Sequence, residues 1–161
     1  TPLTIAGPRE MEKKLGAVNE ALMPGMDLMT PKFDLNYVEV DVMTPTQVGD
    51  LLITAYPANH TGETNPTSVR VEVAGRVISY TGDGAWTKHT SNLAKEADLF
   101  ICECYFYEKP IRFHMNYPDI REHWAELKSK RTILTHFSRE MILHKDDVSE
   151  ETAYDGLVVE L

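Results

Sequence analysis

The sequence predicts an α/β fold in which strands and helices are layered. Segments rich in β-branched and aromatic residues alternate with segments of helical periodicity along the chain. One apolar run, residues 98–104, is nearly continuous, which is typical of a strand covered on both faces. No repeat, low-complexity tract or linker divides the 161 residues, so residues 1–161 are expected to form a single domain.

Hydrophobic period and turn residues predict the elements of the first half. Pro8 suits the first turn of a helix that Pro24-Gly25 ends, and the apolar residues of this helix recur at helical spacing. This stripe, which is expected to face the core, comprises Met11, Leu15, Val18 and Leu22. Strands are predicted at residues 1–7, 37–42, 51–56, 68–73 and 77–81, with loops at 26–34 and 63–67. The last two strands are expected to form a hairpin through residues 74–76.

The second half continues the alternation of helices and strands. Helices are predicted at residues 87–97, 118–130 and 139–144, and strands at 98–104, 132–135 and 153–161. The two cysteines, Cys102 and Cys104, share one face of a strand and are poorly placed to bond each other. They indicate a reduced, cytoplasmic protein with buried thiols, and a two-thiolate metal site is the weaker alternative.

Composition limits the range of partners. The net charge is −9, and so acidic a surface repels phosphate backbones, which makes nucleic acid an unfavourable partner. No apolar run approaches the ~20 residues that span a bilayer, so no membrane association is expected. These observations favour a small-molecule substrate.

Three side chains that can bind metals each follow a predicted strand directly: His60, Asp83 and His136. Loops converge at strand ends, and imidazoles with a carboxylate are ligands for zinc, manganese or iron. An Asp between two glycines is more often a plain turn, and a single His is more often structural. Three such residues at equivalent positions nevertheless indicate a metal centre, in which a carboxylate could bridge two ions.

The chain resembles the metallo-β-lactamase superfamily, and within it the ribonuclease Z-like branch. The resemblance lies in Asn59-His60-Thr61, Tyr80-Thr81-Gly82-Asp83 and Leu134-Thr135-His136-Phe137-Ser138, which are similar in kind and order to the later metal motifs of the family. Residues 97–103, 3–8 and 154–157 are also similar to segments of that branch, so the resemblance covers nearly the whole chain.

The resemblance implies a role for each residue. His60 would bind the first metal, Asp83 would bridge two metals, and His136 would bind the second. His114 would act as a general acid that protonates the leaving oxygen, and Glu103 would orient His114. The residues themselves leave two alternatives open, which are a loop histidine packed among aromatic rings for His114 and a solvent-facing charge for Glu103.

The family's first metal motif, His-x-His-x-Asp-His, does not occur in these residues. The resemblance therefore implies an αββα sandwich that is incomplete and truncated at its N-terminal side, in which metal binding is weak or absent. Such a chain would leave apolar sheet surface uncovered. We accordingly expect it to associate, either as a homo-oligomer or with the missing N-terminal segment.

The leading functional expectation is a metal-dependent hydrolase, inactive as this chain alone and active in the intact protein. The favoured reaction is hydrolysis of a small or cyclic phosphodiester by a metal-bound hydroxide, with zinc as the first choice of metal and manganese or iron as alternatives. The interval between His60 and Asp83 holds a hairpin and no long tRNA-binding arm. The alternatives are hydrolysis of an ester, lactone or thioester, and an incompetent fragment or homologue with a structural or interaction role.

Overall fold

The structure of the chain, a computed structural model, describes residues 1–62 and 65–161. Its strands are β1 (Leu3–Gly7), β2 (Leu35–Glu39), β3 (Thr46–Val48), β4 (Leu51–Pro57), β5 (Thr67–Val73), β6 (Arg76–Tyr80), β7 (Leu99–Glu103), β8 (Thr132–Thr135) and β9 (Glu151–Thr152). Its helices are α1 (Met11–Leu22), the short 3₁₀ helix η1 (Met26–Leu28), α2 (Lys88–Ala94), α3 (Tyr117–Leu127) and α4 (Arg139–Leu143). Part of the predicted 63–67 loop lies outside the described residues.

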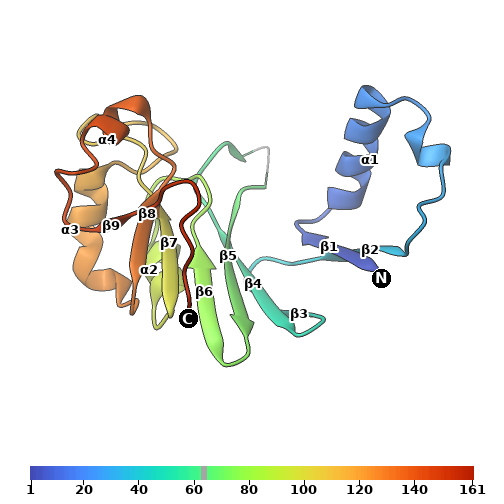
Figure 1. Cartoon of the computed structure of the whole chain (residues 1–161), viewed down its shortest axis with the longest axis horizontal. Coiled ribbons are helices and arrows are strands. Elements are labelled where there is room, and N and C mark those ends of the chain that lie inside the picture. Colours follow the sequence, from blue (N-terminus) through green and yellow to red (C-terminus); the bar gives the residue numbers. More distant parts are fainter. Residues whose placement is uncertain (63–64) are drawn as a thin grey trace.

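Seven strands form one sheet in the order β3-β4-β5-β6-β7-β8-β9 (Figure 1). The pairs from β3 to β6 are antiparallel, and those from β6 to β9 are parallel. The expected hairpin joins β5 to β6. Its two central residues, Ala74 and Gly75, both have positive φ angles, 49° and 75°, as a two-residue turn between twisted strands requires.

The parallel half of the sheet places the predicted metal ligands at one edge. Tyr80, near the end of β6, is in register with Ile101 of β7, and Ile101 is in register with Ile133 of β8. Because parallel strands end at the same edge, the loops that follow β6, β7 and β8 lie next to one another. Asp83 and His136 belong to two of these loops.

The core lies between the sheet and the helices α2, α3 and α4. Phe100 and Cys102 of β7 are fully buried there and belong to one apolar cluster with Leu93, Ile120 and Met141 from the three helices. Reciprocal capping boxes begin two of these helices, at Thr87 for α2 and at Asn116 for α3. Both cysteines are free and buried, as the sequence predicts.

The opposite face of the sheet is apolar and only partly covered. Arg70 reaches the α2 side of the sheet, where it donates to the carbonyl of Leu93, so its neighbour Val71 points to the other side. Val71 is in register with Ile78, and both are half-buried. This face is the one that a second sheet covers in a sandwich.

The strands β1 and β2 form a separate parallel pair that groups with α1 beside the β3–β4 edge (Figure 1). The helix begins at Met11 and not at Pro8, because Glu10 takes a left-handed conformation with a φ of 64°. The expectation that its apolar stripe faces a core is wrong. No residue of α1 is buried, and Val18 and Leu22 are 51% and 74% exposed.

The fold is of the expected α/β class, with one sheet of seven strands and a second sheet of two strands, β1 and β2. The predicted C-terminal strand at residues 153–161 is wrong. On the side of β8 away from β7, the pairing strand is the two-residue β9. The described chain after Thr152 is irregular, with a turn at Gly156 where φ is 87°. Within the described residues, none of the helices has the length and apolar character needed to cross a bilayer.

Candidate metal centre

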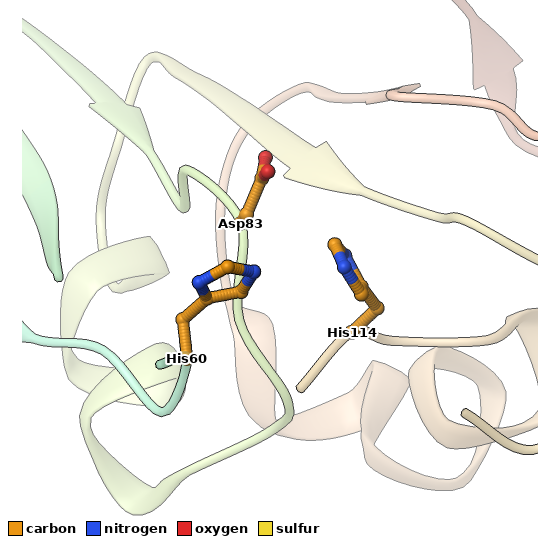
Figure 2. Close-up of side chains that lie close together, drawn as sticks. All are labelled: His60, Asp83 and His114. Atoms are coloured by element: carbon orange, nitrogen blue, oxygen red, sulfur yellow. The ribbon is translucent and has the colours of Figure 1, made fainter. Parts of the chain in front are cut away.

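Four side chains with metal-binding atoms converge at this edge of the sheet. His60 follows β4, Asp83 follows β6, His114 lies between β7 and α3, and His136 follows β8. The ligand atoms of His60, Asp83 and His114 all lie within 4.8 Å of one another (Figure 2). Nε2 of His136 lies 3.5 Å from Oδ1 of Asp83. The structure therefore places Asp83 close to both His60 and His136, and the predicted general acid, His114, lies with them. The ligand atoms of Glu103, His114 and His136 form a second group within 4.8 Å.

The loops of His60 and Asp83 touch through their backbones. Asn59 and Ala85 form an isolated antiparallel bridge, in which the N–H of Ala85 donates to the carbonyl of Asn59 over 2.9 Å. A Cβ atom on the intervening Gly84 would lie 3.4 Å from the nitrogen of Asn59. That distance is an ordinary van der Waals contact, so the two loops pack directly on each other, and this packing brings His60 to Asp83.

Asp83 is positioned by the turn that ends β6. Gly82 has a φ of 60°, a left-handed conformation that suits glycine, and the preceding carbonyl of Thr81 accepts a 2.5 Å hydrogen bond from the hydroxyl of Ser68. The hydroxyl of Thr81 accepts from the backbone N–H of Glu103. The Asp83 side chain remains 42% exposed, so its carboxylate is accessible to a cation from solvent.

His136 has an uncommon backbone conformation. Its φ is 63°, in the left-handed region that a non-glycine residue occupies only at a cost in energy. The flanking structure holds it there, since Thr135 accepts from the N–H of Cys104 and Ser138 caps α4 through the N–H of Met141. Strain of this kind clusters at functional sites. The imidazole is about one third exposed, and its Nε2 lies beside the carboxylate of Asp83.

Glu103 is completely buried beneath the cluster. Its Oε2 accepts a 2.6 Å hydrogen bond from the N–H of Gly84, and its Oε1 is hydrogen-bonded to Nδ1 of His114. Burial raises the pKa of Glu103 to about 8, against the opposing effects of the Gly84 hydrogen bond and of His136. A solvent-facing charge, the alternative for Glu103, is therefore wrong.

The ring of His114 is held by other rings as well as by Glu103. Tyr105 stacks on it at 4.8 Å and contacts the ring of His136 at 5.3 Å. The rings of His60 and His136 lie 5.1 and 5.5 Å from that of His114. Because Nδ1 bonds to Glu103, Nε2 is the nitrogen left for a ligand. Nothing in the sequence marks Tyr105 as the residue that stacks on His114, since any aromatic residue of a loop could fill a core position.

A cavity of about 700 Å³ opens beside His60. One wall is formed by Arg9, just before α1, and by Asp41, just after β2. The other wall is formed by the end of β4 and by Asn59. Arg9 and Asp41 form a two-pronged ion pair of 2.5 and 3.0 Å across 32 residues of sequence. The sequence does not reveal this wall, because the pair joins two loops with no shared motif. The volume suits a small ligand.

The residues present fit a divalent metal ion. Two imidazoles and a carboxylate form a donor set that zinc, manganese and iron accept. The His114–Glu103 pair adds a carboxylate that fixes one ring from behind. The centre supplies these few ligands from the described residues, and a bound ion would have positions open to water or substrate.

The chain matches the profile of the β-lactamase superfamily domain over residues 2–137, and it belongs to that superfamily. Its structure is similar to that of a diphosphatase from the PhnP family, with a TM-score of 0.73 and 16% identity over 100% of this chain and 59% of the other. It is also similar to the metallo-β-lactamase fold protein YhfI from Bacillus subtilis, with a TM-score of 0.68 and 20% identity over 94% and 61%. The short form of human tRNase Z gives a TM-score of 0.68 and 18% identity over 99% and 68%.

These likenesses confirm the metallo-β-lactamase-like fold expected from the sequence. The chain spans about three fifths to two thirds of the length of these three proteins. No sequence in a comparison with curated proteins matches it.

Proposed function

We propose that the protein is a metal-dependent phosphodiesterase that hydrolyses a small or cyclic phosphodiester. The observation that carries this proposal is the position of Asp83 at the end of β6, where its carboxylate lies within 4.8 Å of a ligand atom of His60 and 3.5 Å from Nε2 of His136. Residues so distant in sequence share one edge of the sheet, and a metal centre accounts for the chemistry that they have in common.

His60, Asp83 and His136 would hold the metal, with Asp83 between the two histidines. A divalent metal supplies a hydroxide nucleophile at neutral pH and neutralises phosphoryl charge when bound. Zinc is the first choice, manganese and iron are the alternatives, and two ions per site are proposed for the intact protein. A reducing cytoplasmic setting is part of the proposal, because Cys102 and Cys104 are free thiols.

His114 would deliver a proton to the leaving oxygen. A protonated ring can hold that proton at Nε2, because Nδ1 is bonded to Glu103 behind it. Tyr105 restricts rotation of the ring by stacking at 4.8 Å. Glu103 would fix the direction of the ring through its hydrogen bond to Nδ1, which is a positioning role.

Size and charge support a small substrate. The connection from His60 to Asp83 is accounted for by β5, β6 and short loops, and the cavity beside His60 has about 700 Å³. A net charge of −9 disfavours a polyanion such as tRNA. Two of the similar structures are named a diphosphatase and a tRNase Z, which favours phosphate esters over carboxylic esters in this proposal.

The test is metal analysis combined with turnover by the intact protein. We expect bis(p-nitrophenyl) phosphate to be hydrolysed when zinc or manganese is added, and Asp83→Asn to lower both metal content and kcat. Lys95→Gln is the control, because Lys95 is exposed next to α2 at the opposite end of the parallel strands. Turnover of p-nitrophenyl butyrate or a lactone in place of the diester would overturn the substrate class. Absence of both metal and turnover would overturn the proposal that the protein is an enzyme.

A further inference from the structure

His114 occupies a central position among the side chains that could bind a metal. In the part of the chain that the structure describes, these side chains form two groups, and the ligand atoms within each group lie within 4.8 Å of one another. One group contains His60, Asp83 and His114, and the other contains Glu103, His114 and His136. His114 is common to both, and neither group unites His60 with His136. The third donor beside His60 and Asp83 is therefore the imidazole of His114.

The side chains of the first group surround one space. Figure 2 shows the rings of His60 and His114 on either side of this space, with the carboxylate of Asp83 above it. The two rings are nearly perpendicular, with an angle of 83° and centres 5.1 Å apart. Donor atoms at about 2.0–2.2 Å from a tetrahedral zinc ion lie about 3.4 Å from one another. Separations of at most 4.8 Å exceed this value only slightly, so small side-chain rotations can close the set around an ion.

The hydrogen bonds of both rings leave one nitrogen for an ion. Nδ1 of His60 lies 3.1 Å from Oγ1 of Thr61, and Nδ1 of His114 is hydrogen-bonded to Oε1 of Glu103. Nε2 is then the available nitrogen in each ring. A histidine that binds a metal usually donates its other N–H to a carboxylate or a carbonyl, which fixes its tautomer and orientation. His114 and the buried Glu103 have this arrangement of a ligand and its supporting carboxylate.

We propose that His114 binds the metal ion of this chain through Nε2, as the third ligand beside His60 and Asp83. The inference rests on the metal centre of the proposed function and adds a ligand to it. Two imidazoles and a carboxylate suit zinc, whereas Mg²⁺ and Ca²⁺ prefer oxygen donors alone. His136, whose Nε2 lies 3.5 Å from Oδ1 of Asp83, is a neighbour of this ion and not one of its three ligands.

Metal binding and proton delivery exclude each other at His114. A ring whose Nε2 lone pair is bonded to an ion has no proton at that atom, whereas the proposed general acid needs one there. A chain that binds zinc through His114 is therefore in a resting form, and hydrolysis requires this ring to leave the ion. This gives a physical reason for the expected inactivity of the chain alone.

Titration of the metal-free chain with zinc measures the ligand set without turnover. We expect calorimetry to show one ion per chain and no competition from excess Mg²⁺. His114→Ala should weaken the affinity at least about 100-fold, the upper end of the cost of losing a partner in a metal site, and His136→Ala about tenfold or less. A loss in His114→Ala no greater than that in His136→Ala would overturn the inference.

His144→Ala is the matched control for this titration. Nδ1 of His144 also bonds a carboxylate, that of Asp147, at 2.8 Å, but neither residue belongs to the two groups. We expect the affinity of this variant for zinc to equal that of the wild type. A loss as large as in His114→Ala would mean that removal of any paired histidine disturbs binding, and it would overturn the assignment to His114.

NMR of the ring nitrogens tests the unsubstituted chain, so the result does not depend on how the variants fold. In a chain with nitrogen-15-labelled histidine, one equivalent of zinc should shift the Nε2 resonances of His60 and His114 to metal-bound values, while Nδ1 of His114 keeps its proton. Each resonance is assigned by its absence from the matching alanine variant. A metal-bound shift for His136 with His114 unchanged would overturn the inference.

The inference and the proposed function fail in different ways. If zinc binds through His114 and the intact protein does not hydrolyse bis(p-nitrophenyl) phosphate, the ligand assignment stands and the proposed function fails. If the intact protein hydrolyses the diester and zinc leaves the His114 resonances of this chain unchanged, the function stands and the inference fails. Absence of zinc binding by this chain likewise overturns the inference.

Discussion

Glu103 and His114 are hydrogen-bonded through Oε1 and Nδ1, although Glu103 ends β7 and His114 lies eleven positions later, in the loop between β7 and α3. The second oxygen of Glu103 is used by the N–H of Gly84, at the turn that carries Asp83. A single buried carboxylate therefore ties the proposed proton donor to the backbone of a proposed metal ligand. These two hydrogen bonds explain why an ionisable residue is tolerated at the end of a buried strand.

Glu103→Gln tests the positioning role of this carboxylate. The amide keeps the size of the side chain, but only one of its two terminal atoms is an oxygen, so it cannot accept hydrogen bonds from both Gly84 and His114. We expect kcat to fall about 10- to 100-fold, with KM and metal content close to wild type. Metal analysis and steady-state kinetics of the intact protein check this. A wild-type kcat would show that His114 does not depend on Glu103.

The left-handed conformation of His136 makes a prediction about stability. His136→Gly and His136→Ala both remove the imidazole, but glycine takes a φ of 63° without steric cost. We therefore expect the metal-free glycine variant to be more stable to urea than the alanine variant by about 1 kcal/mol. Both should bind metal more weakly than the wild type. A glycine variant less stable than the alanine variant would contradict the strain.

Asp98 predicts how stability depends on pH. The pKa of its carboxyl is lowered to about 2, chiefly by the hydrogen bond from Lys130 and also by the N–H of Val77. A lowered folded-state pKa stabilises the protein above the unfolded pKa of about 3.9, and that stabilisation is lost as the pH falls toward 2. We expect Asp98→Asn to be less stable than wild type at pH 7, with a difference that shrinks below pH 4. Urea unfolding at pH 7, 4 and 3 measures it, and a constant difference would contradict it.

The apolar surface predicts self-association of the chain produced in isolation. Leu22 and Val18 of α1 are exposed, and Val71 and Ile78 lie on the partly covered face of the sheet. We expect light scattering to give a mass above 18.3 kDa, and Ile78→Lys to lower it. A clean monomer of 18.3 kDa in the unsubstituted chain would count against association.

The sequence predicts those parts of the fold that depend on local patterns. The hairpin at Ala74-Gly75 follows from its turn residues, and β8 follows from a short apolar run. The placement of Asp83 and His136 at one edge follows from the rule that parallel strands end together. Each of these inferences needs only the residues next to one another in the sequence or the direction in which the strands run.

Other features depend on what packs against a segment, and periodicity does not contain that information. The stripe of α1 has the spacing of a core helix, yet Leu22 is 74% exposed because no described element covers it. The residues after Thr152 have the composition of a strand, but in the described structure only Glu151 and Thr152 pair with β8. The Arg9–Asp41 wall and the stacking of Tyr105 are long-range contacts of the same kind.

The hairpin between β5 and β6 begins at the opposite end of β6 from Asp83. Its tip is an exposed two-residue turn, whereas every proposed ligand lies where strands finish. A reporter peptide spliced between Ala74 and Gly75 would consequently be separated from the centre by the length of a strand. That junction offers a place to attach a fluorophore for following ligand binding, while the metal centre at the opposite edge of the sheet is left unchanged.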